Sequence, residues 1–145
     1  MSKVADISSK IKSLLCIENE KFEDVLEKFY RAILTFLEEI EEFREEIVDY
    51  DDIYQFEVED IGFYFWISVN NEEIVFERGV NKNYDIKFIL SKPLVLKVIT
   101  KELEGFDAYM RGLIKAKGPL EYALRFKNFL KQIIIYITYF IEKKK

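Results

Sequence analysis

The sequence contains no histidine and only one cysteine, Cys16, among its 145 residues. Histidine is the usual proton shuttle at neutral pH and the commonest metal ligand, so the sequence lacks the most frequent catalytic and metal-binding arrangements. A single cysteine cannot form an internal disulfide, and as a nucleophile it would lack a histidine base. We therefore expect no enzyme activity, no metal site and no cofactor, with acid-only or tyrosine chemistry as the remaining catalytic alternative.

The sequence also has no long apolar run, and we expect no leader segment. The longest apolar run, IIIYITYFI at 133–141, is well short of the roughly 20 residues that cross a bilayer. Residues 1–17 are polar and are interrupted by lysines and serines, which predicts that there is no signal peptide. Together with the single cysteine, this predicts a cytoplasmic protein. The richness in Lys, Glu, Ile and Tyr suggests a thermophile.

Glycine and proline are scarce, and three of these seven residues, Gly112, Gly118 and Pro119, stand within eight positions. None occurs in residues 20–48, where apolar residues recur at steps of three and four. This spacing predicts one long amphipathic helix over 20–48, preceded by a weaker helical stripe at 7–17. The clustered glycines and proline indicate switches from helix to strand and back to helix.

Five segments alternate between apolar and polar residues, which predicts strands. They lie at 53–60, 62–69, 72–79, 84–90 and 112–118. Turn residues at 70–71 and 81–83 predict that the first four strands form an antiparallel meander. Helices are expected at 91–103 and from about 120 to 141. The predicted fold is a single α+β domain with a five-stranded, mainly antiparallel sheet covered on one face by helices.

Charge is distributed unevenly along the chain, whose net charge is −5. Residues 18–60 carry 17 acids and 4 bases, whereas residues 61–145 carry 9 acids and 15 bases. The glutamates at 38–46 lie on the polar side of the predicted helix and lack a calcium-loop spacing, so we expect a solvated face. The basic residues at 111–131 favour a solvated face or transient contact with an anionic membrane, and not a nucleic-acid site.

The order of elements at 84–130 is similar to that of a known family. A strand YDIKFIL, a short helix KPLVLKVITKEL and the stretch FDAYMRGLIKAKGPLEYALRFKNFL resemble the sterol-carrier-protein, or non-specific lipid-transfer, family of archaeal or bacterial type. The residues that match its pattern are Asp85, Leu96, Thr100, Ala108, Tyr109, Gly112, Lys115, Gly118, Ala123 and Leu124. The chain departs from the family at Pro119 and in its longer, more apolar C-terminal helix.

The resemblance implies one sterol-carrier-protein-like domain over 1–145, with an N-terminal helical extension at about 1–48. It also implies an apolar cavity between sheet and helices that holds a lipid, a fatty acyl chain or a sterol-like molecule. We predict that the cavity is lined by Phe65, Phe88, Leu96, Ile99, Met110, Ile114, Phe129 and Ile133. We predict that the polar end of the ligand is oriented by Tyr84, Tyr109 and Tyr136.

A different interpretation of the same residues remains open. The aromatic residues could fill the interior completely, and the apolar C-terminal helix or the long N-terminal helix could then form a homodimer or dock on another protein. In this alternative the chain is a non-enzymatic interaction or dimerisation module with a packed core.

Overall fold

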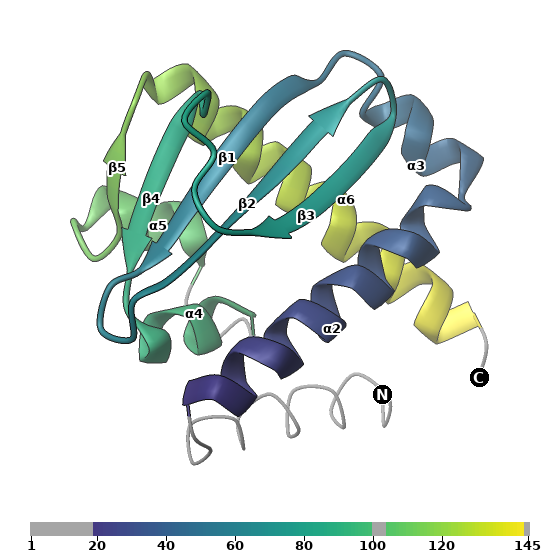
Figure 1. Ribbon diagram of the computed structural model, residues 1–145. Helices are drawn as coiled ribbons and strands as arrows, with labels where there is room; N and C mark the ends of the chain where they lie inside the picture. The colour runs from purple at the N-terminus through teal and green to yellow at the C-terminus, as the bar shows by residue number, and fades with distance from the viewer. Residues whose placement is uncertain (1–18, 100–103, 144–145) are drawn as a thin grey trace.

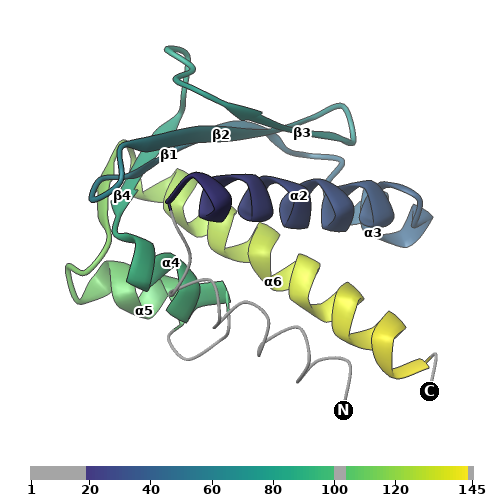
Figure 2. The same cartoon turned by 60° about the horizontal axis from the view of Figure 1, so that its bottom comes forward.

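The computed structural model describes residues 19–99 and 104–143. The helical stripe predicted at 7–17 and the motif residue Thr100 lie outside these residues. The described chain forms a five-stranded sheet in the order β3-β2-β1-β4-β5, and its helices lie on one face of that sheet (Figures 1 and 2). This arrangement confirms the predicted α+β fold class.

Helix α2 (Asn19–Glu38) and helix α3 (Glu41–Glu46) replace the single helix predicted over 20–48, so that prediction was wrong. The chain bends at Ile40, whose N–H bonds to the Leu37 carbonyl at 3.0 Å, and the Arg44 guanidinium caps the Glu38 carbonyl at 2.5 Å. The bend directs Phe43, which is fully buried, into the same core as α2. Burial of that side chain therefore outweighs the helical preference of an uninterrupted sequence.

The first three strands form the predicted antiparallel meander. They are β1 (Asp51–Val58), β2 (Phe63–Asn70) and β3 (Glu73–Arg78). The β2–β3 hairpin turns at Asn71 and Glu72, whose φ angles are 52° and 63°. Two adjacent positive φ angles match the twist of a tight hairpin, so the hairpin is confirmed one residue later than predicted.

Strand β4 (Ile86–Leu90) does not continue the meander, which corrects the predicted strand order. It pairs parallel to β1 and antiparallel to the short strand β5 (Lys115–Lys117), so the sheet is mixed. The connection from β3 to β4 crosses the sheet and is fixed by the buried side chain of Gln55. Its amide nitrogen donates to the Gly79 carbonyl at 3.0 Å, and its amide oxygen accepts from the Asn81 N–H at 2.7 Å. Alternation alone does not specify this pairing partner.

Three further helices complete the layer below the sheet: α4 (Lys92–Ile99), α5 (Gly105–Met110) and α6 (Leu120–Lys143). The Ser91 hydroxyl caps α4, since it accepts a hydrogen bond from the Leu94 N–H at 3.4 Å. Segment 106–110 is helical because the Glu104 carboxylate accepts hydrogen bonds from two backbone N–H groups of its first turn. None of the helices in the described ranges is both long and apolar enough to cross a bilayer.

Candidate functional site

A cavity of about 560 Å³ lies between the sheet and the helices. Small-molecule sites in proteins commonly enclose about 300–1,000 Å³, so this volume can hold a ligand. Strands β1, β2 and β4, helices α2, α4, α5 and α6, and the segment before β5 all contribute walls. The apolar lining residues include Phe56, Phe65, Phe88, Leu90, Val95, Val98, Phe106, Ile114, Ala123, Phe126, Leu130, Ile134 and Ile135.

The floor of the cavity is a layer of phenylalanine rings that lie against the sheet. Phe56 is paired with Phe65 on one neighbouring strand and with Phe88 on the other, with ring centroids 4.8 and 5.4 Å apart. The ring of Phe126 of α6 packs against this layer, with its centroid 5.2 Å from that of Phe56 and 5.3 Å from that of Phe88. These rings pack on one another and form a continuous apolar wall of the cavity.

Four of the predicted ligand-binding residues line this cavity: Phe65, Phe88, Tyr109 and Ile114. Leu96, Phe129 and Ile133 are buried in the hydrophobic core but are not part of the cavity wall. Phe129, for example, is fully buried, and its ring packs 5.9 Å from Tyr50. These three side chains support the wall from behind.

The structure places three other predicted residues away from the cavity. Met110 is 66% exposed, because it is the last residue of helix α5 and lies outside the wall formed by Tyr109. Tyr84 is half-buried before β4, and Tyr136 packs edge-to-face on Phe43 at 5.6 Å; neither lines the cavity. The side chain of Ile99, at the end of α4, lies outside the described residues.

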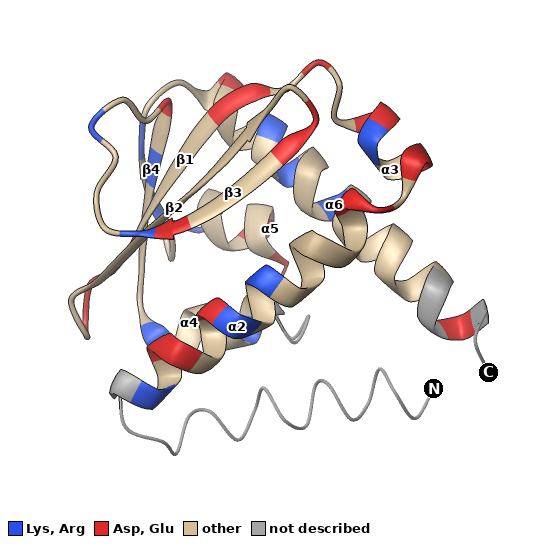
Figure 3. Ribbon diagram, turned by 45° about the vertical axis from the view of Figure 1, so that its right-hand side comes forward, with Lys and Arg blue, Asp and Glu red and all other residues tan. Residues whose placement is uncertain are grey.

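Charged residues of the cavity wall gather where α5 meets α6. Lys127 and Lys131 lie one turn apart on α6 and are both exposed, and Figure 3 shows basic positions recurring along this helix. The Lys127 ammonium lies 4.6 Å from the centroid of the Phe106 ring. The Glu104 carboxylate also lies here, but it is occupied as the cap of α5. The two lysines thus give this end of the cavity, its basic opening, a positive charge.

Tyr30 of α2 also lines the cavity, and sequence reasoning missed it. Its ring stacks on Phe76 at 5.5 Å and lies 6.2 Å from Phe65. Burial raises the pKa of its hydroxyl to about 12, so the group is a neutral donor at physiological pH. The signal that identifies it is the spacing of Leu26, Tyr30, Leu34 and Leu37, which follows the buried side of α2. The apolar stripe read from the sequence includes Leu26 and Leu37 but passes through Phe29 and Ile33 between them, so it leaves out Tyr30.

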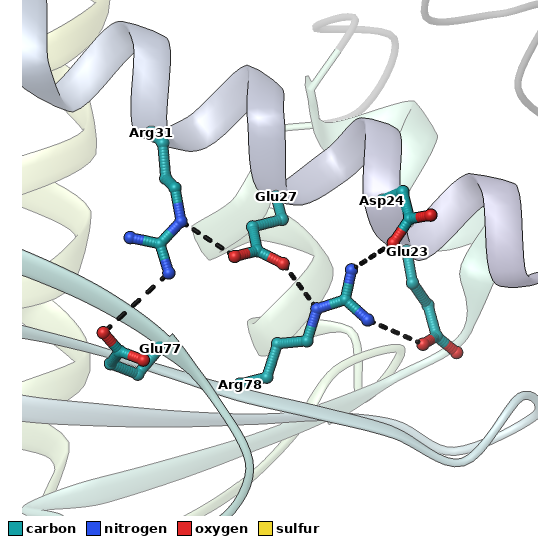
Figure 4. Close-up of polar contacts among 6 residues, drawn as sticks. All are labelled: Glu23, Asp24, Glu27, Arg31, Glu77 and Arg78. Carbon is teal, nitrogen blue, oxygen red and sulfur yellow. Dashed lines mark hydrogen bonds and ion pairs between the residues drawn. The ribbon is translucent and has the colours of Figure 1, made fainter.

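An ion-pair network holds α2 against strand β3, at the edge of the sheet (Figure 4). Arg78 of β3 contacts three carboxylates of α2: Glu27 at 2.5 Å, Asp24 at 2.7 Å and Glu23 at 3.4 Å. Arg31 of α2 in turn pairs with Glu27 at 2.8 Å. The Arg78 side chain remains 37% exposed, so water screens these contacts. The network fixes the helix that carries Tyr30.

We expect replacement of Arg78 by alanine to lower the free energy of unfolding by about 1 kcal/mol, because one guanidinium serves several carboxylates. The loss should shrink in 1 M salt, where exposed charges are screened within about 3 Å. Urea denaturation at low and high salt measures both effects. The matched control is Lys82→Ala, which removes an exposed cation without an ion pair in the described part of the chain. A salt-independent loss at Arg78 would contradict the electrostatic explanation.

A second polar network is enclosed behind the cavity. The Asp52 carboxylate, 2% exposed, accepts hydrogen bonds from the Arg125 guanidinium at 2.7 Å and the Tyr54 hydroxyl at 2.5 Å. Burial, and then the hydrogen bond to Asp52, raise the pKa of Tyr54 far above its ordinary value. Tyr54 is fully buried and does not line the cavity, so this network joins β1 to α6 structurally. Within the described residues, no group of three metal-binding side chains is placed to hold an ion.

The chain is similar in fold to several solved structures. Sterol carrier protein 2 from Yarrowia lipolytica is 17% identical with a TM-score of 0.55, and the match covers 71% of this chain and 84% of that one. A conserved hypothetical protein from Thermus thermophilus is 15% identical with a TM-score of 0.57, covering 71% and 79%. A search of curated protein sequences gave no significant match.

A sec-alkylsulfatase from Pseudomonas sp. is 20% identical, with a TM-score of 0.53 over 59% of this chain. The match spans only 14% of that enzyme's length, so it concerns one part of a much larger protein. The sequence itself matches the model of the SCP-2 sterol transfer family over residues 34–131, about two thirds of the chain. This chain therefore belongs to the SCP-2 sterol transfer family.

Proposed function

We propose that this protein binds a lipid, a fatty acyl chain or a sterol-like molecule in the cavity and carries it between membranes or proteins. The observation that carries the proposal is the cavity of about 560 Å³ with a mainly apolar lining. An apolar chain that leaves water for such a site gains roughly 25 cal/mol per Å² of buried surface. Membership of the SCP-2 sterol transfer family supports the same conclusion.

The basic opening favours one class of ligand, an amphiphile with an anionic head group. Lys127 and Lys131 stand at one end of a mainly apolar cavity, so a carboxylate or phosphate can bind their ammonium groups while the tail lies inside. The exposed position of both lysines lets the head keep part of its hydration. A ligand without a charged group would leave this end of the cavity unused.

We assign the chain a binding role rather than a catalytic one. The acid in the cavity wall, Glu104, is committed to capping α5, and the other charged lining residues are lysines without a neighbouring base in the wall. The alternative of an interaction module with a fully packed core is not favoured, because the interior contains a cavity. Transient contact with an anionic membrane fits the exposed lysines of α6 and belongs to the same proposal.

The direct test is extraction of lipid from protein purified from its native host, followed by mass spectrometry. We expect a stoichiometric amphiphile to co-purify. Delipidated protein should then bind a fluorescent fatty acid at a one-to-one ratio. If the full chain neither retains lipid nor binds the probe, the proposal is wrong.

Filling the cavity should remove binding without unfolding the protein. Ala123 of α6 is 5% exposed and lines the cavity, so Ala123→Phe projects a ring into the space that the ligand needs. We expect at least a ten-fold loss of affinity for the fluorescent fatty acid, about 1.4 kcal/mol. The control is Leu124→Phe, because Leu124 is 39% exposed and does not line the cavity. Equal binding by both variants would place the ligand elsewhere.

A further inference from the structure

The Tyr30 hydroxyl is a polar group in the cavity wall that the protein itself leaves unused. It makes no hydrogen bond to any residue in 19–99 or 104–143. No enclosed polar side-chain atom in the described part of the chain lacks a partner, so this hydroxyl must border open space. Tyr30 is partly exposed and lines the cavity, so we take the cavity to be that open space.

The ring of Tyr30 is held in a fixed position. It stacks on Phe76 with an interplanar angle of 17°, and Phe29 packs against it edge-to-face at 6.0 Å. The ion-pair network around Arg78 fixes α2 over the same strand. A hydroxyl on such a rigid support can recognise an acceptor at a defined place, since little side-chain freedom is lost on binding.

Tyr30 also lies apart from the basic opening. Its neighbours, Phe65 and Phe76, belong to β2 and to the edge strand β3, whereas Lys127 lies on Phe106 of α5. Figures 1 and 2 show α2 running along β3 while α5 lies under the opposite part of the sheet. The cavity thus has two polar places, one at the lysines and one at Tyr30, separated by apolar wall.

We propose that Tyr30 is a specificity-determining residue, which donates a hydrogen bond to an oxygen atom carried by the apolar part of the ligand. The inference rests on the proposed lipid-binding function and restricts the ligand to one class of lipid. That class is an oxygenated amphiphile, with an anionic head group at the lysines and a hydroxyl or carbonyl group along its chain. A plain alkyl chain against Tyr30 removes water from the hydroxyl without replacing its hydrogen bond, which disfavours that ligand. Tyr30 precedes the family-matched residues 34–131, so the feature belongs to this chain's own N-terminal helix.

The test compares matched ligands on the full, delipidated chain. Affinities are measured by calorimetry for stearate against 12-hydroxystearate and for palmitate against 16-hydroxypalmitate. We expect the hydroxylated acid of at least one pair to bind about five-fold more tightly, the effect of one net hydrogen bond. In Tyr30→Phe this preference should fall to about one, while the affinity for the plain acid changes less than two-fold.

The control variant is Tyr64→Phe, which removes a hydroxyl from the opposite face of strand β2 and should keep the preference. The inference is overturned if the native chain binds both members of each pair equally, or if Tyr30→Phe retains the preference. If the native chain binds none of the four acids, the proposed function itself fails. That result differs from equal binding, so the two failures are distinguishable.

Discussion

Replacing Gly118 with alanine is expected to lower the free energy of unfolding by about 4 kcal/mol, because the added methyl group would clash with neighbouring backbone atoms. Gly118 follows β5 and has a φ of +141°, a backbone conformation that side chains rarely adopt. An added Cβ would lie 2.7 Å from the Asp85 carbonyl oxygen and 3.0 Å from the Ile86 Cα. Both are backbone atoms of the neighbouring chain segment, so relief requires β5 to move away from β4.

Urea denaturation followed by circular dichroism measures this loss. The matched control is Gly62→Ala, where φ is +63° but no atom lies within 4 Å of the added Cβ. That variant retains only the backbone cost, about 1 kcal/mol. The difference between the two variants reports the contact between Gly118 and β4. If they are equally stable, close approach of the strands is not the reason for glycine at 118.

The second large effect is expected at Asp52, where alanine should lower the free energy of unfolding by about 3 kcal/mol. The carboxylate is almost completely buried and satisfies both the Arg125 guanidinium and the Tyr54 hydroxyl. Its removal leaves the buried tyrosine donor without its acceptor and deprives the guanidinium of its charge partner. Most of the loss falls on the buried Tyr54 hydroxyl, because Arg125 is 31% exposed and its guanidinium can be rehydrated.

Asp51→Ala provides the control, because that neighbouring residue on β1 is exposed and its loss should change stability by less than about 0.5 kcal/mol. The double variant Asp52→Ala/Tyr54→Phe should recover part of the loss, since it also removes the orphaned hydroxyl. Chemical denaturation of the single and double variants completes the cycle. Strictly additive losses would show that the hydrogen bond between the two side chains contributes nothing.

Periodicity in the sequence predicts which side chains face inward but not which strands pair. Phe63 and Phe65 are buried as predicted, because alternation is a property of each strand alone. Strand β4 pairs parallel to β1 after a connection that Gln55 holds by hydrogen bonds to Gly79 and Asn81, and the polar character of Gln55 gives no indication of that role. Long-range contacts of this kind cannot be deduced from local spacing.

The candidate site was predictable only in part for related reasons. Phe65 and Phe88 lie on strands whose inward face was identified, and both reach the cavity. Met110 was misplaced because segment 106–110 is a helix. Tyr30 was missed because the apolar stripe of the sequence passes through Phe29 in the middle of α2, one residue from Tyr30. Adjacent residues of a helix point in directions about 100° apart. An error of one residue in the predicted buried face can therefore replace a cavity-lining residue with an exposed one.

The family motif predicted the fold more reliably than the site because its residues hold the sheet together. The Asp85 carboxylate accepts a hydrogen bond from the Ile53 N–H at 2.8 Å, which fixes β1 beside the start of β4. Gly118 permits β5 to approach the same point. Ala123 lines the cavity directly, whereas Leu124 is exposed. A motif of this kind therefore predicts the fold of the chain but not the ligand that it binds.

Helix α6 follows all five strands of the sheet in the sequence, which has a consequence for biosynthesis. The helix supplies Phe126, Leu130 and much of the remaining wall that covers the phenylalanine layer of the sheet. A ribosome delivers the chain from its N-terminus, so α2, α3 and the strands emerge while this part of the apolar surface still lacks its cover. Nascent chains that expose such surface are prone to aggregation. The apolar face of the sheet is therefore covered completely only after α6 has been synthesised.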